Sequence, residues 1–240
     1  MPRWGAARGH MLDFMPPLDE PRFEIKIGLP EAKRADLLAW LTRRGMVTLH
    51  PPRHVNSAYF DTDELQCLDA ADAGISARVK PRLRWYGATE KPKKMRFEAK
   101  CKRGPAGYKH IQKIKVKGGL NLAKLSWWDI RAAVADQLEG PLALLLKTAG
   151  RPTAITRYYR EYLINPTGEV RVTIDSQVRL LPQWGSYPQF NRKVILDPIQ
   201  IVEAKAVCSL RHKVADLLSD APGRPSRLSK YALALDPKRT

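Results

Sequence analysis

The stretch KPRLRWYG, residues 80–87, places two arginines on one side of a predicted β-strand. Arg82 and Arg84 are separated by one residue, and alternate residues of a strand face the same side of its sheet. The alternation therefore predicts two like charges held side by side on a rigid element. Such a pair is costly in a low-dielectric interior unless an anion lies beside it. An anionic ligand is the first expectation from this stretch.

The whole chain has the same surplus of positive charge. Its 240 residues include 42 Lys and Arg against 24 Asp and Glu, a formal net charge of +18. A surplus of this size indicates an anionic partner such as nucleic acid, a membrane surface or a phosphate-rich small molecule. Hydrophobic residues make up 44% of the chain, which is enough for a packed core and excludes a disordered tail.

Several absences bear on where the protein works. Cys67, Cys101 and Cys208 form no CxxC pair and no metal-ligand spacing, which fits a reducing compartment. The first residues lack the apolar segment of a secretory signal. The longest apolar run, PLALLLKTAG (141–150), is too short to cross a bilayer. We therefore expect a cytoplasmic protein.

Alternating polar and apolar residues recur along the chain and predict antiparallel strands. The predicted strands are RFEIKIGL (22–29), HVNSAYFDT (54–62), ISARVKPRLRWYG (75–87), KMRFEAKCKRG (94–104), YKHIQKIKVKG (108–118), AITRYYREYLI (154–164), EVRVTIDSQVRLL (169–181) and PIQIVEAKAV (198–207). Helical spacing occurs over 30–45, from Asp61 or Thr62 to Gly74, within 121–150, and over 211–219 and 226–236. Residues 1–20 are predicted to be a flexible lead-in, and residues 21–240 a single domain.

These elements predict an α+β fold of antiparallel strands with helices between them, and a closed barrel is favoured because closure removes exposed edge strands. Most strands have one charged and one apolar face. Shared charged faces join Glu24 with Lys26, Glu98 with Lys100 and Lys102, Arg171 with Asp175, and Glu203 with Lys205. Solvated outer faces would explain this pattern. The alternative is a barrel with its charged faces inside and its apolar faces under helices, whose interior would hold a polyanion.

Phosphoryl chemistry would give a charged interior a purpose. Catalysis of phosphoryl transfer consists largely of positioning and of neutralising charge on phosphate oxygens. Arginine supplies forked donors, lysine a compact charge, and a carboxylate can hold Mg²⁺ or Mn²⁺. Trp85 and Tyr86, directly after the arginines, would either pack outside the interior or stack on a nucleotide base.

The motifs FEIK, NSAYFDT, RLRWYG, FEAKCKRG, YYREYL, RVTID, IVEAK and LSKYALAL occur in the order seen in VTC domains. From about residue 21 to 236 the chain resembles these polyphosphate polymerase domains of the vacuolar transporter chaperone complex, and in particular their bacterial stand-alone relatives. They belong to the triphosphate tunnel metalloenzyme superfamily. The resemblance implies a closed eight-stranded antiparallel β-barrel with peripheral helices, whose lumen is a basic tunnel. It also implies transfer of the γ-phosphoryl group of ATP to a growing polyphosphate chain, with Mn²⁺ or Mg²⁺.

The resemblance further implies the site residues. The catalytic phosphate-binding positions are Lys26, Arg82, Arg84, Lys100, Arg160, Arg171, Lys205 and Lys230, and the candidate metal ligands are Glu203, Glu98 and Glu24. Less certain substrate-binding residues are Lys102, Lys109, Lys113 and Arg157. Either Lys109 or Lys113 would supply one more lysine, and the Y-x-R spacing favours Arg160 over Arg157. Glu98 would assist the metal or pair with a lysine, and Asp175 would orient an arginine or lie on the surface.

One departure from the superfamily pattern separates the alternatives. Its triphosphatases begin with an ExExK strand, whereas the corresponding run here is Arg22 to Lys26. Loss of one carboxylate shifts the expectation from hydrolysis towards transfer. The alternatives are a triphosphatase or polyphosphatase of the same fold and a non-catalytic module that binds polyphosphate or RNA. Carboxylates within the basic rows favour metal-assisted catalysis, and no specific nucleic acid is expected.

Eukaryotic VTC proteins also carry membrane helices, which this sequence lacks. We therefore expect that translocation of the product would need a separate integral-membrane partner, and that this partner would hold the protein at the membrane periphery. The substrates implied by the resemblance are ATP and polyphosphate or triphosphate.

Overall fold

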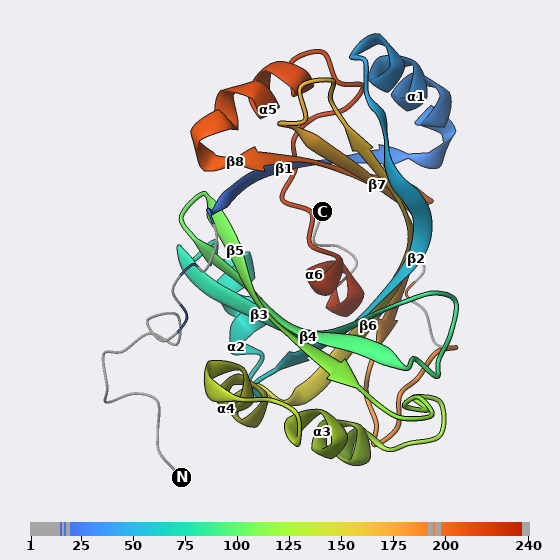
Figure 1. The fold of residues 1–240 in the computed structure, drawn as a ribbon, viewed down its shortest axis with the longest axis vertical. Coiled ribbons are helices and arrows are strands. Elements are labelled where there is room, and N and C mark those ends of the chain that lie inside the picture. The colour runs from blue at the N-terminus through green and yellow to red at the C-terminus, as the bar shows by residue number, and fades with distance from the viewer. Residues whose placement is uncertain (1–14, 16, 18–19, 192–193, 195–197, 237–240) are drawn as a thin grey trace.

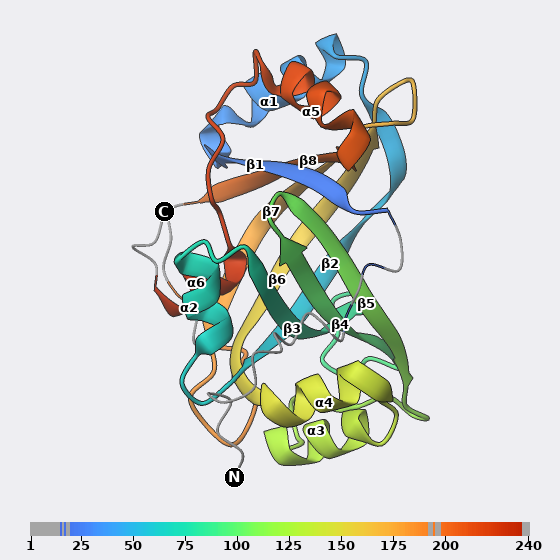
Figure 2. The same ribbon diagram turned by 90° about the vertical axis from the view of Figure 1, so that its left-hand side faces the viewer.

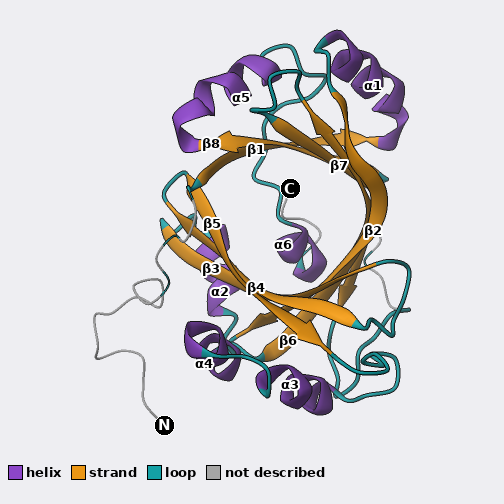
Figure 3. Ribbon diagram, viewed as in Figure 1, coloured by secondary structure: helices purple, strands orange, loops and turns teal. Residues whose placement is uncertain are grey.

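Eight antiparallel strands form a ring with helices on its outside (Figures 1 and 3). The computed structural model describes residues 15, 17, 20–191, 194 and 198–236, so nearly all of the lead-in predicted over 1–20 lies outside the described residues. The strands are β1 (Arg22–Pro30), β2 (Val47–Asp61), β3 (Ala77–Tyr86), β4 (Lys94–Arg103), β5 (Ala106–Lys115), β6 (Arg151–Ile164), β7 (Arg171–Pro182) and β8 (Ile199–Val207). Their order around the ring is β1-β5-β4-β3-β2-β6-β7-β8.

The helices lie between the strands or, for the last three, after β8. They are η2 (Glu31–Lys33), α1 (Arg34–Arg43), α2 (Gln66–Asp72), α3 (Trp127–Ala135), α4 (Gly140–Thr148), η3 (Cys208–Leu210), α5 (Arg211–Leu218) and α6 (Lys230–Leu235). Within the described ranges, none of these helices has the length and the apolar character needed to span a bilayer.

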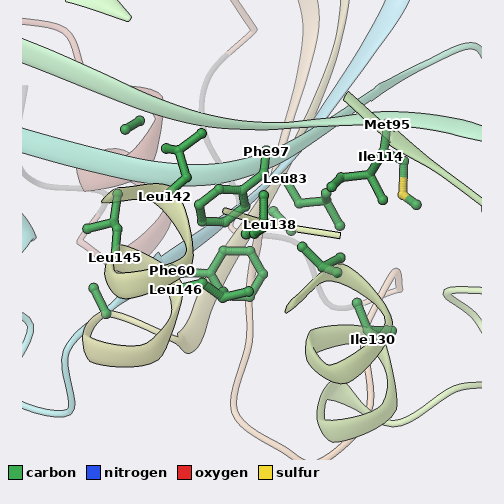
Figure 4. Close-up of a cluster of buried hydrophobic side chains, with 14 of the residues drawn as sticks. Phe60, Leu83, Met95, Phe97, Ile114, Ile130, Leu138, Leu142, Leu145 and Leu146 are labelled. Carbon is green, nitrogen blue, oxygen red and sulfur yellow. The ribbon is translucent and has the colours of Figure 1, made fainter. Parts of the chain in front are cut away.

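The outer face of the ring is apolar and is covered by two pairs of helices, one at each end in Figure 2. Under α3 and α4, side chains such as Phe60, Phe97 and Leu145 form one buried cluster (Figure 4). Under α1 and α5, a second cluster includes Trp40 and Val202. Burial of these apolar faces is the main stabilising contribution of the outer layer.

The β1–β5 junction is the shortest strand contact in the ring. β1 pairs with β8 along its whole length, but it pairs with β5 at one position, Arg22 opposite Gly107. Beyond that position residues 225–229, the C-terminal strap, run along β1: Pro225 pairs with Ile27, and the Ser226 amide donates to the Lys26 carbonyl at 2.9 Å. The strap occupies the first residues of the predicted range 226–236, so the last helix begins at Lys230 rather than at residue 226.

Helix α6 packs against the inner face of the ring, inside the strands (Figure 1). Tyr231 stacks on Tyr59 of β2, with ring centroids 5.0 Å apart, and its hydroxyl donates to the buried Asp61 carboxylate. Leu180 and Ile201, on β7 and β8, complete this third apolar cluster. The inner face is therefore apolar where α6 lies, and it carries charged side chains such as Arg82, Arg160 and Glu203 elsewhere.

β2 begins at Val47, earlier than the predicted residue 54. Its pairing with β6 shifts register between Thr48 and His50 and again between His50 and Arg53. Pro51 and Pro52 fall in this irregularity, where a missing N–H is tolerated. The extension carries Arg53 into the sheet opposite Arg160.

Candidate functional site

Arg82 and Arg84 of β3 lie inside the ring, and each is only 6% exposed. Glu98 lies directly opposite Arg82 on β4. Arg82 donates from Nε and Nη2 to one Glu98 carboxylate oxygen, at 2.8 and 2.5 Å, and Arg84 Nη1 is 3.7 Å from the same oxygen. Burial raises the pKa of Glu98, but Arg82 and Arg84 outweigh it and the net shift is downward. A buried carboxylate, rather than an added anion alone, thus compensates this like-charged pair.

A second network of charges joins β1, β4 and β8. Lys100 Nζ is 2.5 Å from Glu24 Oε1, Lys205 Nζ is 3.3 Å from Glu203 Oε1, and Lys26 Nζ is 3.8 Å from Glu203 Oε2. Burial raises the pKa of Glu24, and the nearby Glu203 raises it as well. Lys100 and Lys26 outweigh both effects, so the net shift of the pKa is downward. The pKa of Glu203 is also raised by burial and then brought well below its ordinary value by Lys205, Lys100 and Lys26. Both carboxylates are therefore ionised at neutral pH.

The third network centres on Asp175 of β7, which is 1% exposed. Arg160 of β6 donates to both carboxylate oxygens, at 2.5 and 2.7 Å, and Lys230 at the start of α6 donates to one of them. Burial raises the pKa of Asp175, but Arg160 and Lys230 outweigh it and lower the pKa overall. Asp175 is thus the residue that orients Arg160, and it also holds α6 to the sheet.

These networks surround one cavity of about 890 Å³, which we call the basic cavity. The cations that line it are Arg22, Lys26, Arg78, Lys80, Arg82, Arg84, Lys100, Lys102, Lys109, Arg160, Lys205, Arg227 and Lys230, and the acids are Glu20, Glu24 and Glu203. Cations exceed carboxylates by a wide margin, so the basic cavity is suited to a multiply charged anion.

The structure brings together most of the residues that the sequence singled out, but four lie elsewhere. Arg171 is exposed at the start of β7, in register with Lys205, and Lys113 is exposed towards the end of β5. Arg157 donates to Glu90 and Asn56, both at 2.9 Å, away from the basic cavity. Glu98 lies behind Arg82 and does not line the cavity. The sequence did not decide between Lys109 and Lys113, and in the structure it is Lys109 that lines the cavity.

Sequence reasoning missed several lining residues. Lys80 and Arg78 precede Arg82 at the same two-residue spacing, and this alternation could have identified them. Lys80 Nζ donates to Ser229 Oγ of the strap at 2.8 Å. Burial, with Lys26 and Lys100 adding to it, lowers the pKa of Lys80 to about 7. Arg227 lies in the strap, where no periodic pattern marks it.

Glu24 and Glu203 are the carboxylates that could hold a divalent metal. The described residues contain no group of three or more His, Cys, Asp or Glu side chains that could form a metal cage. Mg²⁺, however, is commonly bound by one or two carboxylates together with substrate phosphates and water. Glu24 and Glu203 lie close enough to influence each other's ionisation and both line the cavity, so they fit this kind of site.

Comparison with known proteins places this arrangement in a family. Residues 21–236 match the family model of the VTC domain. The chain belongs to the VTC domain family. No curated protein matches this VTC domain.

Two solved structures resemble the VTC domain at low similarity. One is a Vibrio parahaemolyticus protein with a provisional assignment as an adenylate cyclase, with a TM-score of 0.44, 12% identity, and 82% of this chain and 85% of that chain covered. The other is the Mediator head module of Schizosaccharomyces pombe, with a TM-score of 0.43, 12% identity, and 85% and 97% covered. Neither similarity is strong enough to bear on function.

Proposed function

We propose that this VTC domain is a metal-dependent phosphotransferase that makes inorganic polyphosphate from ATP, with the basic cavity as its reaction tunnel. The observation that carries the proposal is the mixture of buried cations and carboxylates around one cavity. A site for simple anion binding needs only cations. Glu24 and Glu203, on the neighbouring strands β1 and β8, suit a divalent cation that is held by one or two carboxylates together with substrate phosphates.

The cations would bind and orient the phosphates. In the described part of the chain neither Lys80 nor Lys109 forms an ion pair with a carboxylate, although both line the cavity. They are therefore available to phosphate oxygens. Arg84 donates from Nε to Ser57 and from Nη2 to Tyr158, but its Nη1 is 3.7 Å from the nearest carboxylate oxygen, longer than a hydrogen bond, and keeps its donors for phosphate.

Glu24 and Glu203 would hold Mn²⁺ or Mg²⁺, which when bound neutralises charge on the transferred phosphoryl group. Lys100, Lys26 and Lys205 keep these two carboxylates ionised and fix their positions. In the proposed reaction an oxygen at the end of the polyphosphate chain forms a bond to the γ-phosphorus of ATP. The bond from that phosphorus to the β–γ bridging oxygen breaks, and ADP leaves with the electron pair.

Transfer is proposed rather than hydrolysis because of Arg22. Its side chain lines the basic cavity two residues before Glu24, where a triphosphatase pattern would place another carboxylate. A cation at this position removes a metal ligand and adds a donor for the phosphate chain.

Incubation of the purified domain with ATP and Mn²⁺ or Mg²⁺, followed by gel analysis of polyphosphate and assay of free phosphate, tests the proposal. We expect growing chains and ADP. Glu203→Gln should reduce their formation by about a hundredfold or more, because it removes an ionised metal ligand. Glu139→Gln, an exposed residue before α4, is the matched control and should have no effect. Phosphate release without chains would indicate a hydrolase, and phosphate binding without turnover a binding module; either result contradicts the proposal.

A further inference from the structure

The inner face of β3, β4 and β5 stays positively charged beyond the basic cavity. Arg84, on the cavity wall, pairs in the strand ladder with Arg96 of β4, and Arg96 pairs with Lys113 of β5. In the next row on the same face, Lys94 pairs with Lys115. Arg53 of β2 belongs to the same end of the ring, next to Tyr86. We call these residues beyond the cavity the rim cations: Arg53, Lys94, Arg96, Lys113 and Lys115.

The rim cations differ from those of the cavity in having no compensating acid. All five are exposed, and no described carboxylate forms an ion pair with any of them. In the cavity, by contrast, Arg82 and Arg160 each hold a buried carboxylate. Like charges on neighbouring strands repel each other. An uncompensated row of them is complementary to an extended polyanion.

Aromatic rings hold two of the rim guanidiniums. Arg53 lies 4.1 Å from the Tyr86 ring centroid and 5.1 Å from that of Tyr162, and its Nε donates to the Tyr162 hydroxyl at 3.0 Å. Arg96 lies 5.7 Å from the same Tyr86 ring. The rings are thus used to orient guanidiniums, whereas single-stranded nucleic acid requires aromatic faces free to stack on bases. This favours recognition of phosphates over recognition of nucleobases.

We propose that the rim cations form a second binding site, for the part of a linear polyphosphate chain that extends out of the basic cavity. This rests on the proposed function, because the cavity holds the end of the same chain. Neighbouring strands are about 4.8 Å apart. The Arg84–Arg96–Lys113 row therefore presents closely spaced charges that continue from the cavity wall to the rim, and successive phosphates of one chain meet them in turn.

The test compares affinities for tripolyphosphate and for long-chain polyphosphate at one salt concentration, without metal. The wild-type domain should bind the long chain more tightly. Arg53→Gln/Arg96→Gln should weaken long-chain binding about tenfold or more and change tripolyphosphate binding less than about twofold, because charge-assisted contacts to distal phosphates are lost. Lys33→Gln/Arg43→Gln, at exposed positions in η2 and α1, changes net charge equally and should change both affinities less than about twofold.

The rim site would be overturned by equal wild-type affinities for the two ligands, by equal losses for both ligands in the rim variant, or by the same long-chain loss in the control variant. If the rim variant lost binding to single-stranded RNA while its polyphosphate binding was unchanged, the rim would be a nucleic-acid surface, and the proposed polyphosphate site would also be overturned. If the wild type does not bind tripolyphosphate at all, the proposed function fails too. If it binds tripolyphosphate but chain length has no effect, only the rim site fails.

Discussion

The two faces of the ring are built from alternate residues of the same strands, yet they are buried in opposite ways. On β4, Phe97 and Cys101 face outward into an apolar cluster under α3 and α4, while Glu98 and Lys100 face the interior. Burial on the outer face is stabilised by removal of apolar surface from water. Burial on the inner face depends on pairing charges, as in the Arg82–Glu98 and Arg160–Asp175 ion pairs.

This difference separates stability from binding. The outer clusters hold the sheet in a ring but touch no ligand, whereas the inner networks hold side chains that a phosphate chain would contact. Substitutions on the outer face should therefore change the free energy of unfolding alone. Substitutions on the inner face should change affinity as well, and their cost in stability should depend on whether the partner charge is also removed.

The largest effect is expected at the Arg82–Glu98 pair. Arg82→Met should lower the free energy of unfolding by about 3–5 kcal/mol, because the buried Glu98 loses its main partner. Arg82→Met/Glu98→Met should recover most of this loss, since neither charge then remains uncompensated. Urea denaturation measures both. A double variant as unstable as the single one would show that packing of Arg82, not charge pairing, matters at this position.

In the outer layer, Leu145→Ala should cost about 2–5 kcal/mol of unfolding free energy, because Leu145 of α4 is fully buried in the cluster between helices and sheet and its truncation leaves a cavity. Tripolyphosphate affinity, measured by calorimetry under conditions where the variant stays folded, should remain within about twofold of wild type. A large loss of tripolyphosphate affinity in the folded variant would contradict the conclusion that the outer face determines stability alone.

A smaller effect is expected from the protonation of Lys80. Its pKa is lowered to about 7 by burial and by Lys26 and Lys100, and a bound phosphate would raise it again. Binding should therefore take up a proton, and affinity should fall by up to about tenfold per pH unit between about pH 7 and 10. In the same window the unfolded state binds more protons than the folded one, so the free domain gains stability as pH rises. Calorimetry in buffers of different ionisation enthalpy measures the proton uptake.

Lys80→Met is the variant that assigns this effect. This substitution should reduce the slope of log affinity against pH by up to one, because up to one proton fewer is taken up on binding. An unchanged slope would mean that other buried cavity lysines, such as Lys109 and Lys205, account for it, since their pKa values are lowered too, in each case by burial first.

Much of the fold could be predicted from the alternation of residue types. Each predicted strand is present, and the expectation of charged faces inside with apolar faces under helices is confirmed by the buried Arg82 and the covered Phe97. The start of β2 was missed because Pro51 and Pro52 read as a break, although a register irregularity accommodates them. The strap was missed because an extended segment without alternation has no pattern.

The site was less predictable because it depends on register and on where strands end. Alternation predicts which face of the sheet a residue lies on, but not its position along the axis of the ring. Arg171, and Lys113 as the alternative to Lys109, were therefore candidates for the tunnel, whereas both lie exposed outside the cavity. Partners across strands are equally hidden: nothing local in the sequence indicates that Glu98 faces Arg82 or that Asp175 receives both Arg160 and Lys230.

The central claim, that the inner face of the ring binds a phosphate chain, is tested most directly by a crystal structure of the domain with tripolyphosphate. We expect the anion inside the ring, with oxygens within hydrogen-bond distance of Arg84, Lys80 and Lys109, and with the Arg82–Glu98 pair intact. An anion bound to an outer surface while these three side chains remain without a phosphate partner would contradict the claim.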